Sequence, residues 1–364
     1  MSIRILHAAD FHLDSPFDAL TEDKAALRRS EQRLLLMRLA ETAEQERADI
    51  VLLAGDLFDS TAGSGETADA LLAMLNNITV PVFIAPGNHD FYSRRSPYAM
   101  LPFPDNVHIF TEPRLTSAEV PGLGVRIWGA GYTDRACPPL LSGFSVPKEE
   151  KYTDILLLHS DFGKKDSPYS PVTAAELAES GFAYAAFGHI HKGVDVQRAG
   201  ECFYAWPGCP EGRGFDECGE KGVLLAELGG GTCRADFLPL ASRHYERIRV
   251  DVGHDALHAV LCAVPEHTER DIYSIILTGE TENAPDMLAL RSALEGRFFS
   301  LTLTDRTELA HDLWERAEED NMHGRFLRRM RALLEEAEDE ERRSLVIAAT
   351  RLGLAAMDGR EVSE

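Results

Sequence analysis

The chain has 364 residues, a formal net charge of −23 and 44% hydrophobic residues. That apolar fraction supports a sizeable core in two or three globular domains, and no apolar stretch is long enough to span a bilayer. The six cysteines lack CxxC spacing, which argues against a structural zinc site. The excess of acidic residues argues against a nucleic-acid substrate, because such binding usually depends on Lys and Arg contacts to phosphates. Met1-Ser2-Ile3-Arg4 leads into the first predicted strand without resembling a signal peptide, so we expect a cytoplasmic protein.

Five short apolar runs predict buried β-strands, and a polar cluster follows each of them. The runs are Ile3–Leu6, Ile50–Ala54, Val82–Ala85, Ile155–Leu158 and Ala183–Phe187. The clusters are Asp10-Phe11-His12, Gly55-Asp56-Leu57-Phe58-Asp59, Gly87-Asn88-His89-Asp90, His159 and Gly188-His189-Ile190-His191. These strands bring carboxylates, imidazoles and one carboxamide to one edge, where open α/β sheets bind ligands. Such a donor set suits two divalent ions, because a bridging carboxylate can hold ions about 3.5–4 Å apart.

The remaining pattern alternates strands with amphipathic helices, which predicts an α/β layered core. Helices are expected over Asp23–Arg47 and Glu66–Asn77, with further strands at Val125–Trp128, Gly222–Glu227 and Ala235–Leu238. From about Ser242 a small βαβαβ module is predicted, over Tyr245–Val252, Asp255–Ala263, Ile272–Thr278, Pro285–Glu295 and Phe298–Thr304. The last sixty residues are predicted to be helical: a charged stretch, Arg325–Arg343, precedes Leu345, Ala349, Leu352 and Ala356 at helical spacing.

The order DxH, GDxxD, GNHD, H and GHxH resembles the calcineurin-like metallophosphoesterases. The opening Ile5–Phe17 and the segment Trp206–Glu217 are similar to bacterial DNA repair exonucleases related to the SbcD nuclease subunit. The resemblance covers about residues 1–240. It implies an α/β fold of two packed mixed β-sheets flanked by helices, followed by a small α+β capping domain and a helical C-terminal tail. The predicted domains are 1–240, 241–306 and 307–364.

The resemblance also implies the metal ligands. Asp10, His12, Asp56 and His191 would hold one ion, while Asp56, Asn88, His159 and His189 would hold the other. Asp56 is expected to bridge, since a carboxylate can be shared between cations whereas a neutral imidazole has one lone pair. The neutral carbonyl of Asn88 limits negative charge and leaves the ions acidic enough to ionise a shared water. Manganese is the expected metal, with iron, zinc and magnesium as alternatives.

His89 resembles the family's histidine that contacts the scissile phosphate and protonates the departing oxygen, a role that suits an imidazole. Asp90 could orient His89, or it could be a turn or helix-cap residue. Asp59 is expected to be structural or to contact a ligand residue. His7 could donate a hydrogen bond beside the first ligand pair, or it could be a core histidine with satisfied hydrogen bonds.

Cations follow several of the motifs and could line a phosphate track around the metals. They are Arg94, Arg95, Lys164, Lys165, Lys192 and Arg213. Locally clustered charge steers ligands even on an acidic protein, and two bound divalent cations would reverse the sign of the field at the site. Ordinary solvated side chains are the competing interpretation.

The leading hypothesis is a manganese-dependent DNA exonuclease of DNA repair, with endonuclease activity as an added capacity. One alternative is a phosphatase or cyclic-nucleotide phosphodiesterase on the same fold, and another is an adaptor that binds DNA ends or an ATPase with little turnover. Family resemblance suggests that the tail docks on an SMC-type coiled-coil ATPase, against the alternative of a tail folded on its own domain. The capping domain is expected to contact DNA, or else to stabilise or dimerise the protein. A homodimer and no membrane partner are expected.

Overall fold

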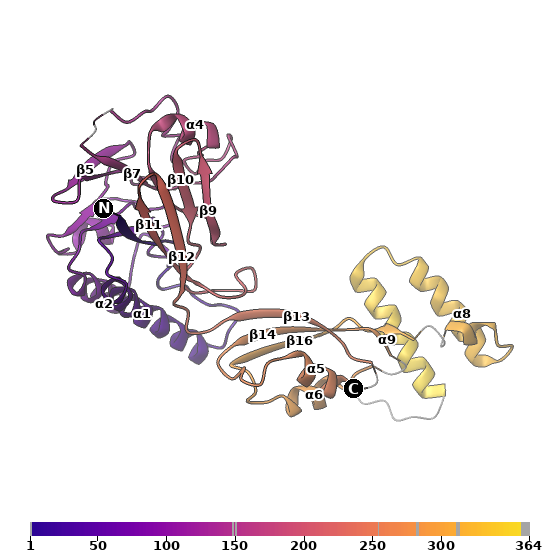
Figure 1. Cartoon of the computed structure of the whole chain (residues 1–364). Coiled ribbons are helices and arrows are strands. Elements are labelled where there is room, and N and C mark those ends of the chain that lie inside the picture. The colour runs from indigo at the N-terminus through magenta and orange to yellow at the C-terminus, as the bar shows by residue number, and fades with distance from the viewer. Residues whose placement is uncertain are drawn as a thin grey trace. The chain divides into compact units, whose positions relative to one another are not determined.

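The computed structural model describes residues 2–147, 149, 151–253, 255–281, 284–310 and 314–357. These residues divide into two compact units, Met1–His244 and Tyr245–Glu364 (Figure 1). The boundary predicted near residue 240 lies close to this division, and the one predicted at 306 falls inside the second unit. The three-domain division stays a prediction, and residues 358–364 of the predicted tail lie outside the described residues.

Unit 1 contains a first mixed sheet of six strands in the order β12-β11-β1-β2-β3-β4. The strands are β1 (Ile3–Ala8), β2 (Ile50–Leu53), β3 (Val82–Ile84), β4 (Val107–Ile109), β11 (Gly222–Gly229) and β12 (Thr232–Pro239). β1 to β4 are mutually parallel, while β11 is antiparallel to both of its neighbours. The helices between these strands are α1 (Glu22–Gln45), α2 (Gly65–Asn77) and α3 (Pro97–Met100).

A second mixed sheet has the order β5-β6-β7-β8-β10-β9. Its strands are β5 (Thr116–Val120), β6 (Val125–Gly129), β7 (Thr153–His159), β8 (Tyr184–Gly188), β9 (Val194–Ala199) and β10 (Cys202–Trp206). β6, β7, β8 and β10 are parallel, and the two edge strands run antiparallel to their neighbours. Helix α4 (Ala174–Ser180) precedes β8 and begins with a capping box between Thr173 and Glu176.

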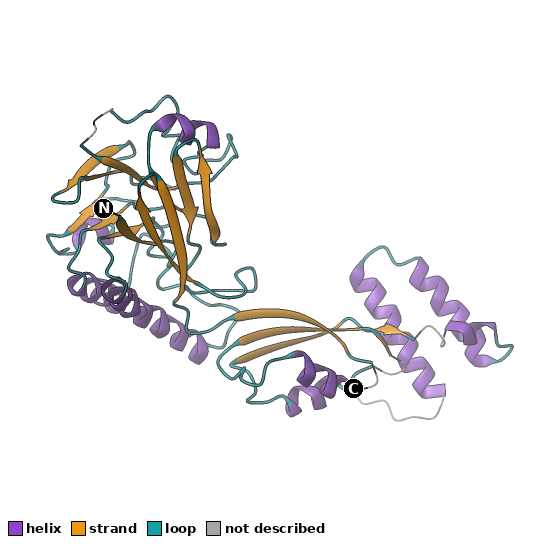
Figure 2. Cartoon of the chain, in the orientation of Figure 1, coloured by secondary structure: helices purple, strands orange, loops and turns teal. Residues whose placement is uncertain are grey.

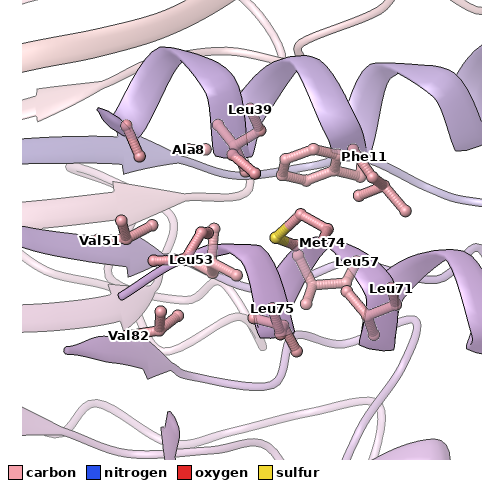
Figure 3. Packing of buried hydrophobic residues seen from close by; sticks show 14 of the residues in the cluster. Ala8, Phe11, Leu39, Val51, Leu53, Leu57, Leu71, Met74, Leu75 and Val82 are labelled. Carbon is pink, nitrogen blue, oxygen red and sulfur yellow. The ribbon is translucent and has the colours of Figure 1, made fainter. Parts of the chain in front are cut away.

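Alternating side chains of the strands divide the core into layers, because successive residues of a strand point to opposite faces. On β1, Ile5 packs between the two sheets, whereas its neighbour Leu6 faces helices α1 and α2. Figure 3 shows the helical side, where Leu39 of α1 and Met74 of α2 meet Leu53 of β2. The outer face of the second sheet packs against α4. The predicted fold of two packed mixed sheets flanked by helices is confirmed.

Unit 2 begins with a parallel sheet in the order β13-β14-β16, formed by β13 (Tyr245–Asp251), β14 (Ile272–Thr278) and β16 (Ser300–Asp305). Helices α5 (Ala256–Ala263) and α6 (Met287–Ala293) pack on it, as Figure 2 shows. The short strands β15 (Glu280–Thr281) and β17 (Glu308–Leu309) pair with each other. The predicted βαβαβ order is therefore present.

The rest of unit 2 is helical, with η1 (Arg316–Glu318), α8 (Met322–Glu335) and α9 (Glu340–Met357). The buried side of α9 carries Val346, Thr350 and Leu354. Two residues of the predicted apolar stripe, Leu345 and Leu352, are instead 59% and 50% exposed. Within the described residues, no helix is both long and apolar enough to cross a membrane.

Candidate metal centre

Parallel strands of both sheets place the predicted ligands at their carboxyl ends. Asp10 and His12 follow β1, Asp56 follows β2 and Asn88 follows β3, while His159 ends β7 and the pair His189 and His191 follows β8. The first two loops run alongside each other, because the Asp10 N–H donates to Gly55 O at 3.0 Å and the His12 N–H donates to Asp56 O at 2.9 Å. Segments far apart in the sequence thus meet at one point.

The backbone at this point is unusual, since four of the seven predicted ligands have positive φ. The values are 56° at Asp10, 44° at His12, 50° at Asp56 and 92° at His189. Non-glycine residues rarely adopt this region, although Asp and His tolerate it better than most. Such conformations cluster at functional sites, where the surrounding structure holds them in place.

Two motif glycines are required by the close approach of neighbouring ligands. A Cβ on Gly87 would lie 2.7 Å from the backbone nitrogen of Asp56 and closer still to its Oδ1 atom. A Cβ on Gly188 would collide with the Ala54 carbonyl and lie 2.9 Å from the Nδ1 atom of His159. The glycines therefore admit the ligand side chains of adjacent strands.

Asp56 lies at the middle of the cluster, almost fully buried. Its Oδ2 atom is 3.6 Å from His12 Nε2 and 3.3 Å from His159 Nε2, so one oxygen faces an imidazole of each predicted ligand set. The His89 N–H donates to the other oxygen, Oδ1, at 2.9 Å and fixes the carboxylate plane. This arrangement suits a carboxylate shared between two cations.

The other predicted ligands surround Asp56. His12 Nε2 and His191 Nε2 are 3.2 Å apart, and Asp10 lies with them in a group whose ligand atoms are all within 4.8 Å. His159 Nε2 is 2.9 Å from the Asn88 Oδ1 atom. Both oxygens of Asp10 accept the His189 N–H, at 3.0 and 3.1 Å, while the His189 ring stands edge-on to His159. All seven predicted ligands therefore belong to one cluster.

The imidazoles are oriented by acceptors on their Nδ1 atoms. The contacts are His159 with Ala54 O at 2.9 Å, His12 with Asp59 Oδ1 at 3.1 Å, His191 with Glu217 Oε1 at 2.7 Å and His89 with Asp59 O at 3.1 Å. Carbonyl and carboxylate oxygens only accept, so in the neutral rings of His12 and His89 the Nδ1 atom carries the proton and Nε2 keeps its lone pair. A neutral His159 ring would have the same tautomer, whereas His191 Nδ1 also faces the Arg213 guanidinium, which only donates. Fixing the tautomer in this way is typical of metal-binding histidines.

Burial and charge shift the pKa values of the same groups. Burial lowers the pKa of His12 and of His189 to about 4, which keeps both rings neutral as ligands must be. Burial would also lower the pKa of His159, but the carboxylates of Asp56 and Asp10 raise it to about 9. Burial raises the pKa of Asp10 to about 6. The arrangement favours a positive charge beside the carboxylates of Asp10 and Asp56, whether that charge is a proton or a metal ion. The set of carboxylate, imidazole and amide donors fits divalent metal ions.

Asp90 does not orient His89 in this structure. Its buried carboxylate accepts the N–H groups of Leu57 at 2.7 Å and Gly87 at 2.8 Å, together with the Tyr98 hydroxyl. It therefore ties the second motif loop to the third, as the alternative of a turn residue expected. The His89 ring is held instead by the Asp59 carbonyl oxygen.

His7 and Asp59 also have identifiable partners. His7 is fully buried and contacts the Tyr184 hydroxyl and Phe187 O, both at 3.0 Å, and burial lowers its pKa to about 3. It is thus a core histidine with satisfied hydrogen bonds. Asp59 contacts the ring of the predicted ligand His12 at 3.1 Å, which is one of the two roles expected for it.

The predicted phosphate-track cations differ in placement. Arg213 folds onto the centre, with Glu217 at 2.7 Å, Asp59 at 3.3 Å and His191 Nδ1 at 3.0 Å. The remaining five are exposed: Arg94, Arg95, Lys164, Lys165 and Lys192. Lys164 lies 3.6 Å from Asp161. The role of these residues in binding phosphate stays a prediction.

Sequence reasoning missed a cavity of about 380 Å³ beside His89 and Asn88. Its wall includes Phe91, Arg135 and Tyr169. Phe91 directly follows the GNHD motif, whereas Arg135 follows β6 and Tyr169 lies in a loop, so no local periodicity indicates that the three side chains share a cavity wall. Glu217 ends the segment Trp206–Glu217 that carries the family resemblance, but no pattern in the sequence predicts its contact with His191.

A family model for calcineurin-like phosphoesterases matches residues 3–193, a range that contains every predicted ligand. The uncharacterized metallophosphoesterase YhaO of Bacillus subtilis is 31% identical over 265 residues, which cover 69% of this chain and 63% of YhaO. The DNA double-strand break repair protein Mre11 of Saccharolobus solfataricus is 26% identical over 240 residues, covering 61% and 60%.

The SbcD component of the nuclease SbcCD of Bacillus subtilis is 25% identical over 267 residues, which cover 62% of this chain and 66% of that protein. The chain thus spans about 60–66% of the length of these three relatives. The match to the family model covers more than half of the chain and coincides with the ligand cluster. The chain belongs to the calcineurin-like phosphoesterase family.

Proposed function

We propose that this protein is a binuclear-metal phosphodiesterase that acts on DNA, as a manganese-dependent exonuclease with endonuclease capacity. The observation that carries the proposal is the position of Asp56 Oδ2 between His12 Nε2 and His159 Nε2. The proposed ligands are the seven predicted ones, Asp10, His12, Asp56, Asn88, His159, His189 and His191. Bound divalent ions would supply Lewis acidity and an activated water for attack on phosphorus.

The chain's own residues would orient the substrate and move the proton. His89 is exposed, and the Asp59 carbonyl holds its Nδ1 atom, which leaves Nε2 as the atom that can donate a proton to the departing oxygen when the ring is charged. The ring also lies edge-on to His12, at 4.8 Å between centroids, which places it beside the ligands. Exposed cations on the motif loops would attract the phosphate backbone.

Two of the relatives support DNA as the substrate, because one is a DNA double-strand break repair protein and the other is a nuclease subunit. The half-exposed Leu345 and Leu352 on α9 offer an apolar strip to a partner helix. We propose an SMC-type coiled-coil ATPase as that partner, together with a cytoplasmic homodimer. A pull-down with the ATPase should lose binding when residues 344–364 are deleted, and retained binding would refute the docking.

The decisive experiment is degradation of end-labelled linear DNA by the full chain with Mn²⁺. We expect metal-dependent cleavage that His89→Ala reduces by about 100- to 10,000-fold, as for loss of a general acid. His258→Ala is the matched control, since His258 is exposed on α5 and outside the ligand cluster. Intact DNA alongside rapid hydrolysis of bis(4-nitrophenyl) phosphate would overturn the DNA assignment in favour of a small-substrate phosphoesterase.

Metal content gives an independent test of the ligand assignment. The wild-type chain should bind two Mn²⁺ ions at saturation, and Asp56→Asn should lower that number because an amide shares its oxygen poorly between cations. Isothermal titration calorimetry measures both stoichiometry and affinity without any turnover. Unchanged stoichiometry and affinity in Asp56→Asn would remove Asp56 from the proposed site.

A further inference from the structure

The cavity beside His89 is lined by several side chains that have no role in binding the metal ions. It is lined by two aromatic rings, one guanidinium, small hydroxyl side chains and the edge of the metal cluster. Phe91 and Tyr169 are half-buried, while Arg135 is exposed. Within the described part of the chain, the Arg135 guanidinium has no hydrogen-bond or ion-pair partner. The one carboxylate in the wall, Asp59, already contacts Arg213 and His12.

The wall that carries Arg135 and Tyr169 is built from two loops joined by backbone hydrogen bonds. The Cys137 N–H donates to Pro168 O at 2.8 Å, and the Ser170 N–H donates to Cys137 O at 2.7 Å. Tyr169 also packs on the ring of His189, with 4.7 Å between centroids. These contacts hold the two side chains beside the predicted ligands rather than on free loops.

Backbone hydrogen bonds also hold the segment that carries Phe91. It precedes Tyr92, whose N–H donates to Tyr132 O at 2.7 Å, and the Tyr132 N–H donates to Pro86 O at 3.0 Å. The segment with Phe91 is therefore tied to the segment that leads to Arg135. The cavity volume of about 380 Å³ lies within the usual range for small-molecule sites, about 300–1,000 Å³.

We propose that this pocket binds one nucleotide unit of a nucleic-acid strand next to the scissile phosphate. The base contacts Phe91 and Tyr169, and the neighbouring phosphate pairs with Arg135. Aromatic rings accept any base, because every base has a π-face, and guanidinium groups pair with phosphate in a bidentate manner. The pocket thus gives a preference for nucleic acid over isolated phosphate without a preference for base sequence. The inference rests on the proposed function and names the substrate unit that the site selects.

The test uses two probes that differ by one phosphate: 2′-deoxyadenosine 5′-monophosphate and 2′-deoxyadenosine 3′,5′-bisphosphate. Their affinities for the full chain with Mn²⁺ are measured by calorimetry, and chromatography verifies that the nucleotides stay intact. The wild type should bind the bisphosphate more tightly. In Arg135→Ala that advantage should disappear, while affinity for the monophosphate stays within about twofold. Arg198→Ala, an exposed arginine on β9 outside the pocket wall, is the control.

Phe91→Ala should weaken both probes by roughly 5- to 150-fold, the range expected for loss of one base-stacking ring. The same variant should raise the KM for a short oligonucleotide, whereas Arg198→Ala should leave that KM unchanged. Equal affinities of Arg135→Ala and wild type for the bisphosphate, or an unchanged KM in Phe91→Ala, would overturn the pocket while DNA cleavage still stands. Nucleotide binding with intact DNA would instead refute the proposed function and keep the pocket.

Discussion

Substitution of Gly87 by alanine tests the geometry of the metal centre through a single methyl group. The added Cβ would lie 2.7 Å from Asp56 N and 2.8 Å from Asp56 Cγ, and closer still to Oδ1. Ordinary non-bonded carbon contacts are about 3.5–4.0 Å, so the Asp56 side chain must move by roughly 1 Å. Because the backbone nitrogen is also too close, rotation of the side chain alone cannot relieve the clash.

Two effects of different size follow. Overpacking should lower the free energy of unfolding of the metal-free chain by about 1–3 kcal/mol. Displacement of Asp56, the carboxylate that we propose is shared between the ions, should weaken Mn²⁺ binding by about 10- to 100-fold, comparable to the loss of an outer partner of a metal ligand. A misplacement of 1 Å would further reduce turnover by on the order of 100-fold.

Urea unfolding gives the first quantity, and calorimetric titration with Mn²⁺ gives the second. Gly65→Ala is the matched control, because Gly65 opens α2 and a Cβ there meets nothing within 4 Å. It should leave metal binding unchanged and stabilise the chain by about 0.4–1 kcal/mol. If Gly87→Ala binds two Mn²⁺ ions with wild-type affinity, the close packing of Gly87 against Asp56 has no role in shaping the site.

Three further predictions concern the packing around the centre. Arg28 and Glu211 form an ion pair at 2.6 Å, and both side chains are fully buried. Arg28→Ala should lower the free energy of unfolding in urea by about 3–5 kcal/mol, because it leaves the buried charge of Glu211 without its ion-pair partner. A loss below 1 kcal/mol would contradict this. Burial alone would raise the pKa of Glu31, but hydrogen bonds from Arg243 and Arg28 lower that pKa below its ordinary value of 4.5. The ionised carboxylate therefore stabilises the fold above pH 4.5, and this stabilisation is lost as the pH falls through the lower pKa of the folded state. Glu31→Gln should therefore weaken the dependence of the unfolding midpoint on pH below pH 4.5. Glu41 is exposed on the same helix, so Glu41→Gln should leave that dependence unchanged. Asp90→Asn should destabilise the fold by about 1–3 kcal/mol, since an amide cannot accept all of the donors around it; lost turnover at unchanged stability would indicate a catalytic role instead.

The sequence predicted the strands that deliver the ligands because each is a buried apolar run followed by a polar motif. The two edge strands of the second sheet, β5 and β9, were harder to predict. β9 alternates exposed and half-buried residues, and β5 includes the polar pair Thr116 and Ser117, so neither forms an apolar run. Helix α9 carries apolar residues on more than one side, and its periodicity alone could not decide whether Leu345 or Val346 faces inward. That choice depends on the tertiary contacts of unit 2.

The candidate site was predictable to the extent that its residues lie in ordered motifs. The partners that orient the imidazoles were not, because contacts such as His191 with Glu217 join loops whose approach depends on the fold. The sequence could not decide between the two roles left open for Asp90, because the residues around it are the same in both cases. Only the folded structure shows that its carboxylate accepts from Leu57 and Gly87 rather than orienting His89.

The left-handed backbone at Asp10, His12, Asp56 and His189 has a consequence for the life of the protein in a cell. Such conformations cost about 1–3 kcal/mol each, against a total stability of roughly 5–15 kcal/mol for a typical protein. Ions that bind only the folded chain offset part of this strain, by about 2.7 kcal/mol at a hundredfold excess over the Kd. We therefore expect newly made chains that lack their metal to be degraded sooner, so that the divalent metal supply controls abundance as well as activity.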